Sequence, residues 1–351
     1  MSKTREVRVG KVIVGGGAPV SVQSMAKADP HEADALKKQV LAVAERGCEI
    51  FRLTVPDEAA AKVFGEVRAV SPIPLVADIH FDYRLALAAL EAGADAVRIN
   101  PGNIGSAEKV REVVRAAQAK GAAIRIGVNA GSLEKAEAEN AANASTVDRL
   151  CASALKHIRL LEAENFHNIV VSAKISNAAE TIAVYRRLAE LTEYPLHLGV
   201  TEAGTLLPGT VRNSVALGVL LAEGIGDTIR VSLTAKPEKE VKVALEILRS
   251  LGRRAAGPTV TSCPTCGRTM VDLQRVATQI EDALETLNLP KYPHLAVMGC
   301  VVNGPGEAKG AELALCGGKS GEFLLYKGGE FVEKIPETDA VKKVVEYVVS
   351  L

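Results

Sequence analysis

The chain has 351 residues, of which 48% are hydrophobic, 24% charged and 3% aromatic. This composition belongs to a folded globular protein with room for one large and one small domain, and it excludes intrinsic disorder. Lysine plus arginine (42) balance aspartate plus glutamate (42), and tryptophan is absent, so neither a nucleic acid nor a membrane surface is expected as a partner.

The amino terminus, MSKTREVRVGKVIVGG, is charged and lacks the apolar core of a signal peptide. The longest apolar run, at 215–222, falls far short of the roughly 18 residues that a membrane span needs. We therefore expect a cytoplasmic protein. Six cysteines are too few for a disulfide scaffold in a chain of this length, and in a reducing compartment their uneven clustering favours a metal site or catalysis.

Short β-branched runs alternate with amphipathic stretches roughly every 25 residues. The predicted strands are 20–24, 49–53, 75–79, 96–100, 123–126, 168–173, 196–200 and 228–232. Segments of helical spacing, such as 32–46 and 107–120, follow them. Eight strand–helix pairs in roughly 250 residues predict an α/β fold of the (β/α)8 TIM-barrel type. The alternative is an open, doubly wound sheet, because the sequence cannot show whether the last strand pairs with the first.

The alternation ends near Gly252, which predicts a barrel domain at 1–252 and a second domain at 253–351. The second domain contains a predicted helix, an apolar strand, a glycine-rich turn, a hairpin and a terminal helix, at 271–287, 294–298, 299–310, around Gly328 and Gly329, and from Thr338. These elements indicate a small α+β module.

Polar residues end the predicted barrel strands, where the active site of this fold lies. We predict that the substrate-binding or catalytic residues among them are Arg52, Asp78, Arg98, Arg125, Asn129, Lys174, Glu202 and Ser232. Such residues could simply pair with one another at a solvated rim. However, three arginines and a lysine from four different units would crowd one mouth, which is costly unless an anion such as a diphosphate fills it. Glu202 would donate or accept a proton, and Asp78 would hold a substrate hydroxyl or orient an arginine.

The second domain carries a CxxC motif, Cys263-Pro-Thr-Cys266, followed by Cys300 and Cys316. A CxxC pair with a third, distant thiolate supplies three corners of a metal or cluster site. Cys316 as fourth ligand would give an ordinary four-thiolate zinc or electron-transfer site. Glu307 would instead place a carboxylate on one iron, which would then exchange ligands more readily. Cys48 and Cys151 are expected to be small buried hydrophobic residues.

The segments TSCPTCGR and GCVVNGPGEA closely resemble signatures of the 4-hydroxy-3-methylbut-2-enyl diphosphate synthases, the iron–sulfur reductases of the non-mevalonate isoprenoid pathway. The barrel segments VQSM, FRLT, ADIHFDY, VRINPGNIG, IRIGVN and GVTEAG are similar to the same family, in its two-domain bacterial form. The resemblance implies a [4Fe–4S] cluster held by Cys263, Cys266, Cys300 and Glu307. It also implies 2-C-methyl-D-erythritol 2,4-cyclodiphosphate as substrate and ferredoxin or flavodoxin as one-electron donor.

The direction of the chain predicts the assembly. Each barrel helix runs from the catalytic face to the opposite face, so the second domain begins on the side away from its own barrel mouth. Without a long linker around 252–258, the simplest arrangement is a head-to-tail homodimer with composite active sites, which the resemblance also implies. A monomer that folds over its own mouth is the alternative.

Two functions from other classes stay open. One is a phosphosugar-binding barrel lyase or isomerase with a structural four-cysteine zinc domain. The other is a nucleic-acid-binding zinc ribbon fused to an inactive barrel, which the neutral charge and scarce aromatic residues disfavour.

Overall fold

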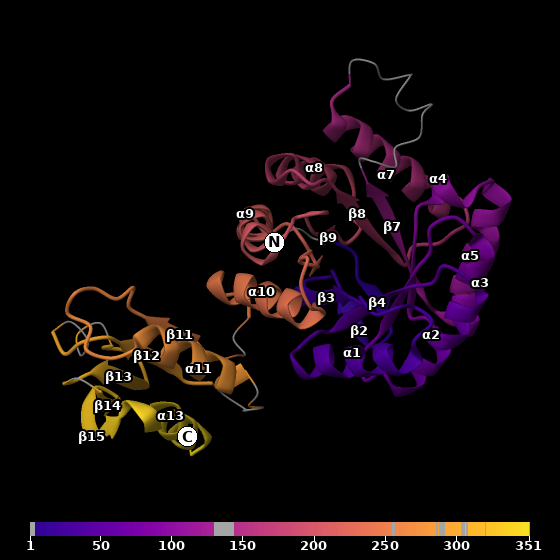
Figure 1. Cartoon of the computed structure of the whole chain (residues 1–351). Helices are drawn as coiled ribbons and strands as arrows, with labels where there is room; N and C mark the ends of the chain where they lie inside the picture. The colour runs from indigo at the N-terminus through magenta and orange to yellow at the C-terminus, as the bar shows by residue number, and fades with distance from the viewer. Residues whose placement is uncertain are drawn as a thin grey trace. The chain divides into compact units, whose positions relative to one another are not determined.

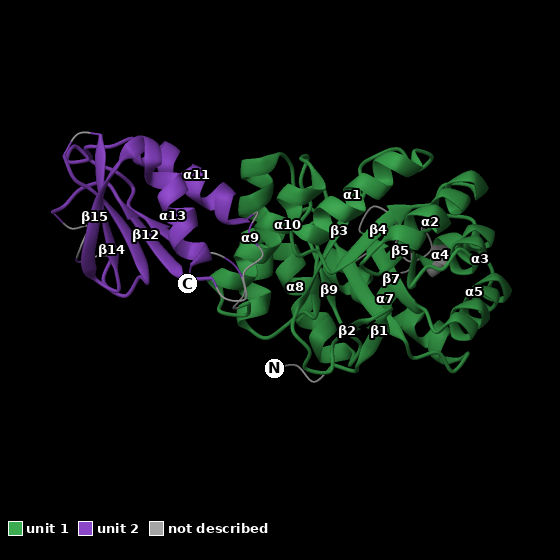
Figure 2. Ribbon diagram, turned by 90° about the horizontal axis from the view of Figure 1, so that it is seen from below, with its two compact units in different colours: residues 1–254 green, residues 255–351 purple. Residues whose placement is uncertain are grey.

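The computed structural model describes residues 4–129, 144–254, 257, 259–285, 287, 292–302, 306, 308–319 and 321–350. The chain forms two compact units, Met1–Arg254 and Ala255–Leu351, which Figure 2 colours separately.

The first unit is a closed barrel of eight parallel strands, which confirms the predicted fold class. The strands are β3 (Ser21–Met25), β4 (Ile50–Thr54), β5 (Leu75–Asp78), β6 (Ala96–Ile99), β7 (Ala123–Asn129), β8 (Ile169–Lys174), β9 (His197–Leu198) and β10 (Thr228–Ile229). Strand β10 pairs with both β9 and β3, and a bridge between Val171 and Leu196 joins β8 to β9. The open, doubly wound sheet is therefore wrong.

Helices surround the ring of strands (Figure 1). They are α1 (Ala33–Glu45), α2 (Glu58–Val70), α3 (Tyr83–Glu91), the short α4 (Pro101–Ile104), α5 (Ala107–Lys120), α7 (Thr146–Glu162), α8 (Ala178–Leu191), α9 (Leu206–Ala222) and α10 (Pro237–Ser250). Helix α2 illustrates how the local sequence forms these helices. The Asp57 side chain caps its amino end by accepting a hydrogen bond from the Ala60 amide, and Phe64 and Val67 lie on its buried face.

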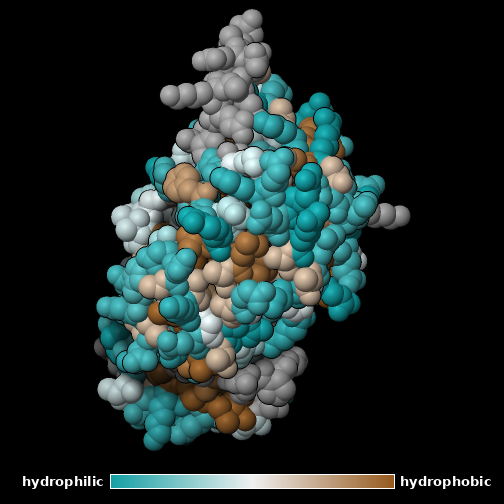
Figure 3. Space-filling model, turned by 90° about the vertical axis from the view of Figure 1, so that its right-hand side faces the viewer, coloured by the Kyte–Doolittle hydropathy of each residue, from teal (hydrophilic) through white to brown (hydrophobic). Residues whose placement is uncertain are grey.

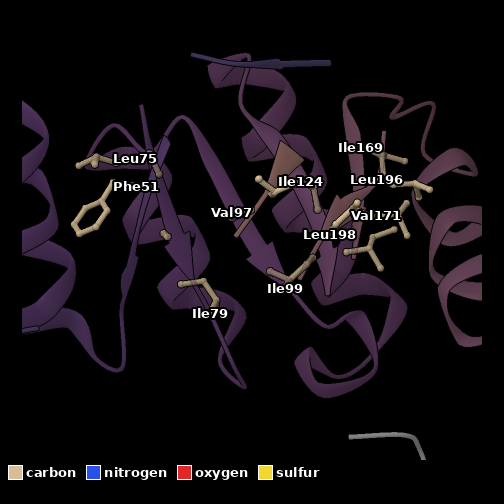
Figure 4. Packing of buried hydrophobic residues seen from close by; sticks show 14 of the residues in the cluster. Phe51, Leu75, Ile79, Val97, Ile99, Ile124, Ile169, Val171, Leu196 and Leu198 are labelled. Atoms are coloured by element: carbon tan, nitrogen blue, oxygen red, sulfur yellow. The ribbon is translucent and has the colours of Figure 1, made fainter. Parts of the chain in front are cut away.

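The main hydrophobic layer lies between the strands and these helices. Figure 4 labels members of it, among them Phe51, Leu75 and Ile124, which extend from β4, β5 and β7. A full layer on this outer side frees the inward-facing positions for polar residues near the carboxyl ends of the strands.

A hairpin that the sequence analysis did not predict closes the floor of the barrel. Strands β1 (Val7–Val9) and β2 (Val12–Val14) pair antiparallel, and Val7, Val9 and Val14 pack against inward-facing apolar residues such as Ile50 and Val76. Because the amino-terminal end is sealed in this way, the carboxyl end is the face available for a site.

The described residues of the second unit form a mixed five-stranded sheet and helices that pack on it. The strands are β11 (Thr259–Ser262), β12 (His294–Met298), β13 (Leu313–Gly317), β14 (Glu322–Lys327) and β15 (Glu330–Pro336), in that order across the sheet. The first three are mutually parallel and the rest antiparallel. Helices α11 (Leu273–Glu285) and α13 (Ala340–Val349) bury one core with the sheet, and a short 3-10 turn (Glu337–Asp339) precedes α13. The predicted strand at 294–298 and the hairpin at Gly328 and Gly329 are confirmed.

Hydrophilic residues predominate on the face of the molecule shown in Figure 3. None of the helices in the described ranges is long and apolar enough to cross a membrane.

Candidate active site

The polar residues of strands β4 to β8 project into the barrel near its carboxyl end. Strand register places Asp78 beside Arg98, Arg98 beside Arg125, and Asn129 beside Lys174. Arg98, Arg125 and Lys174 are at most 8% exposed. The structure thus brings together the cationic residues that the sequence analysis expected to converge.

Asp78 lies among these cations. Its carboxylate is 3.4 Å from Arg98 Nη1, 3.8 Å from Arg52 Nε and 3.9 Å from His80 Nε2. Burial by itself would raise the pKa of Asp78, but the positive charges of Arg52 and Arg98 outweigh burial and lower the pKa below its usual range. Asp78 is therefore an ionised carboxylate that orients the two arginines.

Arg98 occupies a space that only glycine leaves open. Its Nη2 donates to the Gly127 carbonyl over 3.2 Å, and a Cβ added at Gly127 would lie 2.2 Å from Arg98 Nε. Asn129, with its amide oriented to satisfy both of its groups, accepts from Arg98 Nη2 over 3.3 Å. The guanidinium is therefore held by Asp78, Asn129 and the β7 backbone.

Arg125 and Lys174 carry charge deep inside the barrel. Arg125 donates through Nη1 to Gln23 Oε1, while its Nε and Nη2 have no hydrogen-bond partner among the residues described. Burial first, and then repulsion from Arg52, lower the pKa of both side chains well below their ordinary values. An anion at the mouth of the barrel would stabilise the charged forms of both side chains.

Glu202 and Ser232 lie on the loops that follow β9 and β10. Glu202 is exposed and has φ of +52°, a left-handed conformation that is costly for a residue with a Cβ. Ser232 is half-buried and its carbonyl accepts from Asn213 Nδ2 over 3.3 Å. Within the described ranges, neither side chain makes a hydrogen bond or ion pair with another residue. Both are therefore available to a ligand.

Three polar residues of the interior were not predicted from the sequence, namely Gln23, His197 and Glu240. Gln23 holds Arg125, His197 is fully buried, and Glu240 forms ion pairs with Lys27 and Arg230. Gln23 and His197 lie within apolar strands, and the only sequence signal for a role in the interior is that a polar residue occurs there. Glu240 belongs to the first turn of α10, where an acidic residue is common for reasons of the helix dipole.

In the second unit, the cysteine loops follow the carboxyl ends of neighbouring parallel strands. Cys263 directly follows β11, and Cys300 follows β12 after Gly299. The Gly299 amide donates to Cys263 Sγ over 3.3 Å, a contact that favours a thiolate. Cys266 is exposed, and hydrogen bonds from Arg268 lower the pKa of its thiol. These thiols meet the chemical needs of a cluster edge.

Cys316 has a different environment. It lies inside β13 with no exposed surface, packed with Ala296, Met298 and Ala314. Burial, followed by the nearby Cys300 and Cys263, raises the pKa of Cys316 to about 12. Cys48 and Cys151 are also buried, with pKa values raised by burial to about 12 and about 11.

The residues described in this unit include no group of three or more His, Cys, Asp or Glu side chains gathered closely enough to hold a metal ion. Glu307, the expected carboxylate ligand, lies outside the described residues. The fit to an iron–sulfur cluster rests on the donor set: three partly or fully exposed cysteines on two adjacent loops, one of them accepting an N–H···S bond.

Comparison with protein families matches residues 4–245 to the GcpE TIM-barrel domain and residues 259–350 to the GcpE protein C-terminal domain. Among curated proteins, 4-hydroxy-3-methylbut-2-en-1-yl diphosphate synthase (flavodoxin) of Symbiobacterium thermophilum is 52% identical over 346 residues, covering 99% of this chain and 92% of the relative. The protein of the same name from Geobacter sulfurreducens is 52% identical over 338 residues, covering 96% and 95%.

Among solved structures, the dihydropteroate synthase of Yersinia pestis has a TM-score of 0.51 at 14% identity, covering 70% of this chain and 97% of that protein. At this identity the likeness concerns the barrel fold alone.

Proposed function

The chain belongs to the GcpE family, and we propose on that premise that it is an iron–sulfur oxidoreductase with the activity of its curated relatives. It reduces 2-C-methyl-D-erythritol 2,4-cyclodiphosphate to 4-hydroxy-3-methylbut-2-enyl diphosphate, opening the ring and removing a hydroxyl. A lyase or isomerase with a structural zinc domain finds no support in these relatives.

The observation that carries this proposal is the buried cationic interior at the barrel's carboxyl end. Arg98, Arg125 and Lys174 are nearly inaccessible, and among the residues described the cations here outnumber the carboxylates. Unpaired buried cations destabilise a fold unless an anion completes the site. A diphosphate supplies the missing charge and matches the planar arginine forks.

The chain's own groups divide the work of binding and proton transfer. We assign Arg52, Arg98, Arg125 and Lys174, with Asn129 and Ser232, to the diphosphate. Opening the ring turns a bridging oxygen into a charged terminus, and these fixed donors stabilise that charge as it develops. Asp78 keeps Arg52 and Arg98 in place. Glu202, exposed and free of protein partners among the described residues, protonates the departing hydroxyl.

The proposed cofactor is a [4Fe–4S] cluster held by Cys263, Cys266, Cys300 and Glu307. When bound, the cluster supplies electrons one at a time. Cys316 is assigned no ligand role, because its side chain is buried within a strand while the other three cysteines lie on loops. The names of the curated relatives favour flavodoxin as electron donor, and a ferredoxin is the alternative.

We propose a homodimer in which the cluster unit of one subunit serves the barrel of its partner. Arg254, the last residue of the first unit, donates to the Val20 carbonyl and to Glu49 Oε2, at the amino ends of β3 and β4. The chain thus leaves the barrel on the face opposite Arg98. Only five peptide steps separate Arg254 from β11, a reach of about 18 Å, which is less than the roughly 21 Å length of α10.

An apolar surface on the barrel fits this second copy. Leu207, Val211 and Val215 recur every fourth residue along α9 and are 50% to 74% exposed. They adjoin a groove of about 440 Å³ between α9 and α10, lined by Leu206, Val243 and others. Exposed apolar stripes of this kind mark protein interfaces. The same surface on two subunits can pair about a two-fold axis.

The direct test is anaerobic purification followed by analysis of iron, sulfide and zinc, and then incubation with the cyclodiphosphate and a one-electron reductant. A brown protein with equal iron and sulfide that forms the open diphosphate supports the proposal. A colourless protein that contains zinc and leaves the cyclodiphosphate unreduced contradicts it.

A further inference from the structure

A buried carboxylate stands behind the cationic interior without a role in the reaction proposed above. Glu240, in the first turn of α10, has no exposed side-chain surface. Its Oε1 forms an ion pair with Lys27 Nζ at 2.9 Å and accepts from Arg230 Nη2 at 2.9 Å and the Leu233 amide at 3.0 Å. Its Oε2 accepts from Ser24 Oγ at 2.9 Å and Arg230 Nε at 3.2 Å. Four hydrogen-bond donors and one ion-paired ammonium group therefore surround the two carboxylate oxygens.

A buried carboxylate of this kind stabilises the contact between strands and helix at a high cost in desolvation free energy. Desolvating a carboxylate and a guanidinium costs several kcal/mol, and apolar side chains of the same volume would often hold the elements together equally well. What this arrangement adds is a fixed geometry: one edge of the Arg230 guanidinium, formed by Nε and Nη2, donates two parallel hydrogen bonds to the Glu240 carboxylate. Glu240 also ties the ends of β3 and β10, through Ser24 and Leu233, to the same point.

The two hydrogen bonds to Glu240 leave the Nη1 group of Arg230 available. Only Nε and Nη2 are engaged, so Nη1 has no hydrogen-bond partner in the described part of the chain, and the Arg230 side chain is 14% exposed. Arg230 lies near Lys174: a Cβ at Gly199 would sit 2.7 Å from the Arg230 carbonyl oxygen and 2.9 Å from Lys174 Nζ. Arg230 also precedes Ser232 by two residues, the spacing that returns an extended chain to the same face.

We propose that Glu240 is a positioning residue for the diphosphate: by fixing Nε and Nη2 of Arg230, it aims Nη1 at the ligand beside Lys174 and Ser232. This inference rests on the proposed function, since it names the ligand as the diphosphate of that same site. Glu240 itself does not touch the ligand. Its charge also offsets that of Arg230, which lets this cation lie close to Lys174 before an anion arrives.

The test is a double-mutant cycle on the holoenzyme, with Glu240→Gln, Arg230→Met and the double variant. Calorimetry with the cyclodiphosphate and no reductant gives Kd without turnover, and steady-state assays separate KM from kcat. We expect Glu240→Gln, whose amide N–H faces other donors, and Arg230→Met each to weaken binding about tenfold. KM should rise while kcat stays within about twofold. The double variant should bind no more weakly than either single one.

Glu238→Gln is the matched control, because it removes the same charge from the same helical turn and Glu238 makes no hydrogen bond to Arg230 in the described residues. It should bind like the parent. The proposal would be overturned if the losses of binding free energy in the two single variants added up in the double variant. It would also be overturned if Arg230→Met bound the cyclodiphosphate as tightly as the parent. Should Glu240→Gln fail to fold, Arg230→Met still decides, together with Arg230→Lys, which keeps the charge but loses the fork. A parent protein that does not bind the cyclodiphosphate would instead overturn the proposed function.

Discussion

Replacing Gly127 by alanine displaces the Arg98 guanidinium without removing any charge. Gly127 lies in β7 with ordinary strand backbone, so the substitution brings no strain in φ. The new Cβ would meet Arg98 Nε at 2.2 Å and Arg98 Cζ at 2.9 Å, distances that real Cβ atoms do not show. Arg98 must therefore swing away from Asp78 and from the Gly127 carbonyl. Crowding of this kind costs about 1–3 kcal/mol of stability.

The larger effect is expected on binding. A charge-assisted contact between Arg98 and the diphosphate is worth about 1.5–3 kcal/mol, which corresponds to roughly 10- to 150-fold in Kd. The assay is calorimetric titration of the reductant-free holoenzyme with the cyclodiphosphate, beside Arg98→Ala, which should lose a similar amount.

Gly65→Ala is the matched control for Gly127→Ala. Gly65 lies in α2, where an added Cβ makes only ordinary contact with Ala92 at 3.5 Å. This variant should bind like the parent and be about 0.5–1 kcal/mol more stable. If Gly127→Ala binds the cyclodiphosphate as tightly as the parent, a fixed Arg98 is not part of the diphosphate site and the reasoning fails.

Three further outcomes are expected. Cys300→Ser and Glu307→Ala should lose activity and yield a missing or fragile cluster, whereas Cys316→Ser should be nearly silent in iron content and turnover; the reverse pattern would indicate a four-thiolate site. Burial first, and then the neighbouring arginines, lower the pKa of Lys174, so stability should rise with pH from that lowered pKa up to the unfolded value of about 10.4. An anion raises the same pKa, so calorimetry in alkaline buffers of different ionisation enthalpy should show proton uptake on binding, absent in Lys174→Met. Val211→Asp should shift the sedimentation coefficient toward the monomer, because it places a charge on the apolar stripe of α9; an unchanged dimer would refute that interface.

The barrel could be predicted from the sequence because strands buried on both faces leave apolar runs at regular spacing. Each predicted strand overlaps an observed one, from 20–24 with Ser21–Met25 to 228–232 with Thr228–Ile229. The β1–β2 hairpin was missed because its strands have three residues each, too few to show a period. Strands β11 and β13 were missed for a related reason, since they flank glycine- and cysteine-rich loops that dominate the local pattern.

Site residues could be predicted from the sequence where a polar residue ends an apolar stretch, but not where a polar residue lies within such a stretch. Lys174, the last residue of β8, follows the first rule, whereas Gln23 sits in the middle of β3. The role of Glu240 depends on contacts with residues more than 200 positions away, at Ser24 and Lys27, which no local pattern records. The depth of Arg125, held by Gln23, likewise follows only from the closed barrel.

The most direct test of the central claim, that the cationic barrel and the cysteine loops act on one substrate across two subunits, is complementation. Cys300→Ser and Arg98→Ala chains are coexpressed with different tags. Mixed dimers are assayed with reduced flavodoxin and with the cyclodiphosphate well below the raised Kd of Arg98→Ala, where neither chain alone turns over appreciably. Random pairing makes half of the dimers mixed, each with one intact site, so unfractionated protein should recover about one quarter of the parent's activity. Mixed dimers that contain both chains and a full cluster on the Arg98→Ala chain, yet form no product, would contradict the account.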